Sequence, residues 1–174
     1  EVIGYVNLLA AAGNETTTNL VSNATVLLDR HPDQRRRLVE DPGLISHAVE
    51  EFLRYDSPVQ GLERDLSEDL EVQGQTIPRG AKLFLLIAAA NRDPQAWEYP
   101  DQLKLDRAKP ERHLGFGYGI HFCIGAPLAR LEVRVALEEL LAGTQRIELD
   151  PDRPSAFAPS IFVRRLQHLH LRVH

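Results

Sequence analysis

The chain has no methionine and only one cysteine among its 174 residues. A single cysteine cannot form an internal disulfide, so nothing points to an oxidising compartment, and we expect a cytoplasmic protein. No apolar run approaches the roughly 18 residues of a membrane-spanning helix, and the formal net charge of -5 gives no electrostatic basis for binding nucleic acid. We therefore expect no association with a membrane or with nucleic acid.

The composition is typical of a folded domain, with 43% hydrophobic and 26% charged residues. A chain of this length buries roughly 70% of its extended surface on folding, which predicts one domain over residues 1–174. Helical spacing starts at Glu1 with no capping residue before it. Together with the missing methionine, this predicts an excerpt of a longer sequence.

Hydrophobic periodicity predicts a mainly α protein with small antiparallel β-sheets. The expected helices cover residues 2–28, 33–40, 44–55 and 123–141. Short strands are expected within 59–87, near 145–149 and over 161–173. The stretch 93–115 is proline-marked, and we expect it to be irregular.

The only cysteine, Cys123, lies in the glycine-rich run FGYGIHFCIGA at residues 116–126. Because glycine has no side chain, the backbone at these positions can bend tightly or lie against a flat cofactor. A thiol near the first turn of a helix is favoured as the thiolate, the form that binds metals. The alternative is a buried, inert cysteine, but the glycine spacing favours a metal ligand.

This run resembles the haem-binding loop of the cytochrome P-450 superfamily, Phe-Gly-x-Gly-x-His/Arg-x-Cys-x-Gly, at every fixed position. The resemblance implies the P-450 fold and a haem b cofactor, with Cys123 as the iron ligand and His121 as a partner of a haem propionate. It places Phe116, Gly117 and Gly125 against the cofactor. It also implies that residues 1–174 form the C-terminal part of one P-450 catalytic domain, with the N-terminal part absent.

A second cluster, AGNET at residues 12–16, lies within the first expected helix. Glycine and threonine are poor residues for a helix interior, and the Thr16 hydroxyl can bond back to the carbonyl of Ala12 and bend the helix. Taken alone, a packing glycine beside solvated threonines is the simpler interpretation. The cluster resembles the family's oxygen-activation motif, Ala/Gly-Gly-x-Asp/Glu-Thr. That resemblance implies that Ala12 and Gly13 face the haem and that Glu15 and Thr16 deliver protons to dioxygen.

Glu51 and Arg54 lie three residues apart on an expected helix, where they can form a charge-assisted pair. On a solvated surface such a pair contributes at most roughly 1 kcal/mol. They resemble the family's Glu-x-x-Arg element, and Arg107 corresponds to its third member, so the implied triad locks the core around the haem loop. Glu50 is the alternative carboxylate, and we expect it to be exposed.

Arg64 resembles the family's basic residue for a haem propionate, although alone it is typical of a solvated strand residue. We expect His113 to be structural, like most histidines away from a metal. The run 35–37, three arginines, is typical of a solvated helix face. The alternative is a docking surface for an acidic electron-transfer partner.

The segments that resemble the family's substrate-contacting parts contain Leu9, Val59, Gln60 and Ile161. These residues predict a largely apolar substrate cavity. The implied function is a haem-thiolate monooxygenase that inserts one oxygen atom from O2 into a small organic substrate. Electrons come from NAD(P)H through ferredoxin reductase and ferredoxin, and we expect the 174 residues alone to be inactive. The alternatives are a non-catalytic or partner-binding remnant of the fold and a peroxide-dependent peroxygenase, which would not need the Glu15-Thr16 pair.

Overall fold

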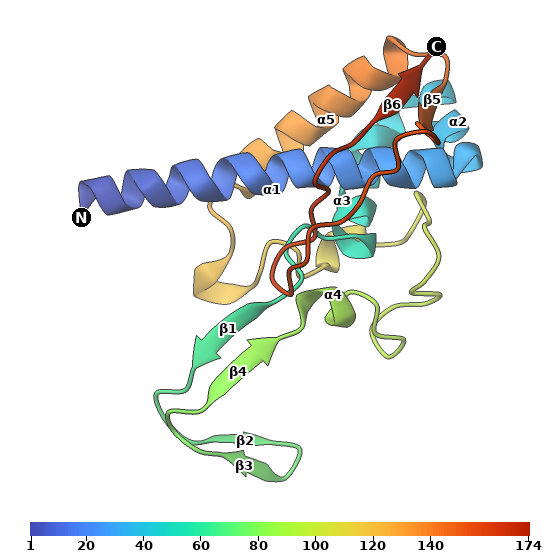
Figure 1. Ribbon diagram of the computed structural model, residues 1–174. Helices are drawn as coiled ribbons and strands as arrows, with labels where there is room; N and C mark the ends of the chain where they lie inside the picture. Colours follow the sequence, from blue (N-terminus) through green and yellow to red (C-terminus); the bar gives the residue numbers. More distant parts are fainter.

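Helix α1 (Val2–Arg30) is the longest element of the computed structural model, which describes residues 1–174 (Figure 1). The predicted helix over 2–28 is confirmed, with two more residues at its end. Its buried side chains begin at Asn19, so only the C-terminal part of the helix packs against the rest of the protein. The N-terminal part extends outward with apolar side chains exposed.

Two shorter helices follow, both close to the predicted spans. Helix α2 (Pro32–Glu40) begins with proline, which suits a first helical turn because its missing N–H is not needed there. A 3-10 turn (Pro42–Leu44) leads into α3 (Ile45–Tyr55), which ends shortly before Pro58. The last helix, α5 (Ala126–Ala142), starts three residues later than predicted, because Cys123 and the two residues after it remain in the loop.

The core lies where α1, α3 and α5 meet. Seventeen buried apolar residues form one cluster there, and the side chains of Phe52, Val133 and Leu137 have no exposed surface. Helix α3 is covered almost all round, since every residue from Ala48 to Arg54 is buried. None of the helices combines the length and apolar character needed to cross a membrane.

The strands form three two-stranded antiparallel sheets, which confirms the predicted small antiparallel sheets. Strand β1 (Leu62–Asp65) pairs with β4 (Lys82–Leu85), and β2 (Leu70–Val72) pairs with β3 (Gln75–Ile77). A short helix, α4 (Ile87–Ala90), follows β4. Near the end of the chain, β5 (Ile147–Leu149) pairs with β6 (Leu171–Val173).

The predicted strand over 161–173 is wrong for most of its length, because only Leu171–Val173 is a strand. The preceding stretch contains two isolated bridges, Val59 with Val163 and Phe157 with Leu166. The backbone turns at Ser160, whose hydroxyl oxygen accepts hydrogen bonds from the next N–H groups at Phe162 and Val163. This turn interrupts a regular ladder and places the segment beside residues 59–60.

Candidate haem-thiolate site

The loop before α5 presents Cys123 as a free, partly buried thiol. Gly117 and Gly119 have φ of 74° and 67°, a left-handed conformation that side chains disfavour. The Cys123 N–H donates a 2.8 Å hydrogen bond to the Phe116 carbonyl, which closes the loop on itself. A Cβ added at Gly125 would lie 3.8 Å from the sulfur, in ordinary contact distance. The sequence therefore builds a tight loop with little side-chain bulk around one thiol.

Large apolar side chains of this loop face solvent. The exposed fractions are 86% for Tyr118, 97% for Ile120, 51% for Phe122 and 78% for Ile124. Apolar groups of this size gathered in one loop indicate a surface that binds something apolar. A haem needs a soft anionic donor for its iron and apolar surface for its faces, and this loop offers both. The residues present therefore fit the cofactor, and the His121 side chain is exposed at the end of the turn Gly119–His121.

The α1 cluster keeps its helical backbone and forms the predicted local bond. The Thr16 hydroxyl donates to the Ala12 carbonyl at 2.7 Å, which confirms the expected i−4 hydrogen bond. Ala12 and Gly13 are exposed, and a Cβ added at Gly13 would meet nothing within 4 Å. The Glu15 side chain is 54% exposed, and its Oε1 lies 3.5 Å from Nε of Arg165. In Figure 1 the N-terminal half of α1, which contains this cluster, and the loop before α5 both extend toward the left of the view.

Glu51, Arg54 and Arg107 come together in the protein interior. The Glu51 carboxylate accepts hydrogen bonds from Arg54 at 2.8 and 2.9 Å and from Arg107 at 2.9 and 3.1 Å. It also accepts one from the backbone N–H of Lys104 at 3.0 Å. The side chains of Glu51 and Arg54 have no exposed surface, and that of Arg107 is 6% exposed. The three charges tie α3 to the irregular segment 98–107.

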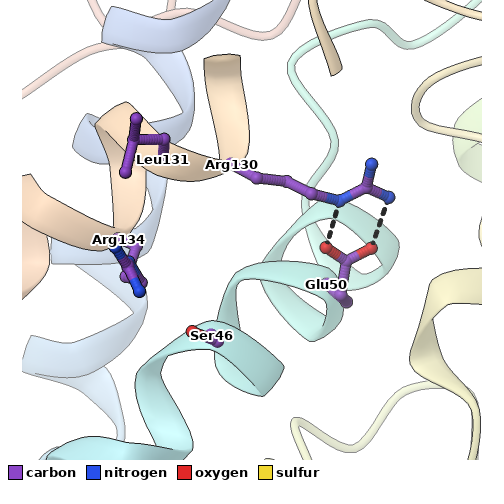
Figure 2. A pocket seen from close by; sticks show the side chains of 5 residues that line it. All are labelled: Ser46, Glu50, Arg130, Leu131 and Arg134. Carbon is purple, nitrogen blue, oxygen red and sulfur yellow. Dashed lines mark hydrogen bonds and ion pairs between the residues drawn. The ribbon is translucent and has the colours of Figure 1, made fainter. Parts of the chain in front are cut away.

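The expectation that Glu50 is exposed is wrong. The residue is 9% exposed, and its carboxylate accepts hydrogen bonds from Arg130 at 2.6 and 2.9 Å (Figure 2). The ring Nε2 of the buried His113 lies 3.2 Å from the same carboxylate. Burial alone raises the pKa of Glu50, but the hydrogen bonds from His113 and Arg130 outweigh it and lower this pKa to about 2. Because Arg130 is 80 residues away, no local spacing in the sequence signals this contact.

The remaining candidates lie in three places. Arg64, on β1, is half-buried and donates only to the neighbouring carbonyl of Glu63, at 2.9 Å. Gln60 lies against the 160–163 turn, because its N–H donates to the Phe162 carbonyl at 2.8 Å. Val59 and Ile161 therefore belong to one region, whereas Leu9 is exposed on α1 and makes no hydrogen bond or bridge with it.

Comparison with known proteins identifies the family. A family model described as "Cytochrome P450" matches residues 43–160. The chain is 45% identical over 162 residues to the "Biotin biosynthesis cytochrome P450" of Bacillus subtilis, covering 93% of this chain and 40% of that protein. It is 50% identical over 150 residues to the "Vitamin D(3) 25-hydroxylase" of Pseudonocardia autotrophica, covering 86% of this chain and 37% of that protein. The chain thus spans well under half the length of these relatives.

The fold also matches that of a solved structure. The crystal structure of CYP109E1 from Bacillus megaterium in complex with corticosterone superposes with a TM-score of 0.94 at 40% sequence identity. That match covers 99% of this chain and 46% of the other. Cytochrome P450 proteins bind haem, the cofactor that the Cys123 loop fits. The sequence motif, the mainly α fold and these comparisons lead to one conclusion: the chain belongs to the cytochrome P450 family.

Proposed function

We propose that the chain is the C-terminal part of the catalytic domain of a cytochrome P450 monooxygenase, which inserts one oxygen atom from O2 into a small, largely apolar organic substrate. The observation that carries the proposal is the loop at 116–126, where one thiol is surrounded by bare glycine backbone and exposed apolar side chains. When bound, haem supplies the iron centre at which dioxygen is activated. The relatives named as a cytochrome P450 and as a hydroxylase support this assignment.

Cys123 supplies the anionic sulfur ligand in this proposal. The thiol lies just before the first turn of α5. As a thiolate, Cys123 would hold the haem iron and supply electron density to it. The exposed His121 and the half-buried Arg64 are proposed to pair with the two haem propionates, since neither side chain forms an ion pair within the chain.

Glu15 and Thr16 are proposed to move protons. The Thr16 hydroxyl commits its hydrogen to the Ala12 carbonyl, so its oxygen lone pairs remain available to accept a hydrogen bond and a proton. Glu15 is half exposed and can exchange protons with solvent before passing them to its neighbour. A positioned proton transfer of this kind is typically worth about 10²–10⁴ in rate.

The substrate and electron-transfer partners are proposed from chemistry. Val59, Gln60 and the 160–163 turn offer apolar surface with one amide group, and the Gln60 amide is engaged with the Ser57 carbonyl at 2.6 Å. A mainly apolar substrate agrees with the corticosterone held by the structural relative. Electrons are proposed to come from NAD(P)H through a ferredoxin-type partner, and the protein is proposed to act in the cytoplasm.

The decisive test is the absorption spectrum of the reduced protein under carbon monoxide. A thiolate ligand shifts the Soret band characteristically, and Cys123→Ala should abolish that band because these 174 residues contain no other thiol. A chain extended upstream of Glu1 that binds no haem would support the non-catalytic remnant instead. A thiolate spectrum that survives Cys123→Ala would overturn the ligand assignment.

A further inference from the structure

The buried carboxylate of Glu50 stands at the start of a chain of contacts that ends at Cys123. Glu50 holds the Arg130 guanidinium by two hydrogen bonds and lies within hydrogen-bonding distance of His113. The Gly115 N–H donates to Nδ1 of His113 at 3.0 Å, so this nitrogen is an acceptor. The ring hydrogen is then on Nε2, which donates it to Glu50. One carboxylate therefore fixes two side chains from distant parts of the sequence.

Both of these side chains pack on Phe116. The Arg130 guanidinium carbon lies 4.7 Å from the centroid of the Phe116 ring, in the range of a cation–π contact. The His113 ring lies 5.6 Å from the same ring. The Phe116 carbonyl accepts the hydrogen bond from the Cys123 backbone. The position of the thiol thus depends on a residue whose ring is held by the two partners of Glu50.

Little besides Glu50 and the Phe116 ring restrains Arg130. A cavity of about 320 Å³ lies beside the pair, lined by Ser46, Leu131 and Arg134 as well (Figure 2). The Arg130 side chain is 35% exposed, so the guanidinium has room to swing away when its partner is removed. Figure 2 shows Arg134 on the same helix, one turn further on and outside the Glu50 pair.

We propose that Glu50 is a positioning residue for the haem ligand: through Arg130, His113 and Phe116 it holds the loop in the geometry that presents the Cys123 thiolate. This inference rests on the proposed role of Cys123. Groups that orient a metal ligand from outside typically change metal affinity by about 10–100-fold when mutated. A buried carboxylate with no contact to the cofactor can therefore determine how well the cofactor is held.

The test compares Glu50→Gln and Arg130→Gln with Arg134→Gln in the haem-loaded protein. Three quantities are measured: the share of the reduced carbon monoxide complex with the thiolate spectrum, the rate of haem transfer to apomyoglobin, and the urea unfolding free energy. We expect both pair variants to lose part of the thiolate spectrum and to release haem about tenfold faster. Arg134→Gln should match the wild type. Arg130→Lys, which keeps the charge but not the two-point contact, should give an intermediate result.

A purely structural role predicts a different pattern. It would lower the unfolding free energy of the pair variants while their folded fraction kept the full thiolate spectrum and the wild-type haem release, and this outcome would overturn the inference. If Glu50→Gln does not fold, the comparison of Arg130→Lys with Arg134→Gln decides by the same criterion. A wild-type protein without a thiolate spectrum would instead refute the proposed ligand, and the inference with it.

Discussion

Replacing Glu51 by alanine should be the most damaging single change in the buried triad. Glu51 is the only anion between Arg54 and Arg107, and it accepts two hydrogen bonds from each. The intact triad carries two positive charges and one negative charge in the interior. Glu51→Ala leaves two guanidinium groups without their carboxylate, whereas Arg107→Ala leaves the Glu51–Arg54 pair intact.

The magnitude follows from the burial of all three groups. Removing one partner of a buried ion pair costs about 3–5 kcal/mol, because an uncompensated charge stays in the interior. We expect Glu51→Ala to reach the upper end of this range and Arg107→Ala, which leaves a compensated pair, to fall below it. The total stability of a domain is roughly 5–15 kcal/mol, so the first variant should be close to unfolding.

The assay is equilibrium urea unfolding followed by circular dichroism, with midpoint and slope compared between variants. A matched control is Arg37→Ala, which removes a surface pair with Asp106 whose atoms lie 3.5 Å apart. These two side chains are 37% and 61% exposed, so the control should lose about 0–1 kcal/mol. A loss for Glu51→Ala no larger than this control, or smaller than for Arg107→Ala, would refute the reasoning from buried charge.

Three further outcomes are expected. Thr16→Ala should leave haem and substrate binding intact but divert reducing equivalents into peroxide, since a relay hydroxyl is lost; unchanged coupling of NAD(P)H oxidation to product would remove Thr16 from the mechanism. The Glu50 pKa falls from 4.5 to about 2 on folding, so its contribution to stability is complete above pH 4.5 and disappears as the pH falls toward 2. The unfolding free energies of the wild type and Glu50→Gln, measured in urea, should therefore converge by about 3 kcal/mol over that interval, and a constant difference would contradict the assignment. The 174 residues alone should retain haem only weakly through gel filtration, because the apolar side chains of the loop remain exposed to water. A chain extended upstream of Glu1 should retain it. Tight, stoichiometric haem binding by the shorter chain would contradict this expectation.

The features that depend on short-range spacing could be predicted from the sequence. The bond from Thr16 to the Ala12 carbonyl spans four residues, and the Glu51–Arg54 pair spans three, so helical geometry alone brings the groups together. The glycines around Cys123 likewise specify the loop locally, through backbone conformations that other residues avoid. The helix positions followed from hydrophobic periodicity, and the hairpins within 59–87 from periodicity together with turn residues, which are local signals of the same kind.

The tertiary structure decided what lies around those local features. The sequence led us to expect an exposed Glu50, but every residue of α3 from Ala48 to Arg54 is buried. Glu51 faces Arg107, the partner that the family resemblance implied, whereas Glu50 faces Arg130 from α5, a partner that nothing in the sequence indicated; the two contacts span 56 and 80 residues of sequence. Such long-range partners produce no periodic pattern in the sequence. A buried charge is stabilised by the groups that the fold places against it, whatever their position in the chain. The sequence by itself thus determined the thiol, its loop and the family, while long-range packing alone decided which charges are buried behind that loop.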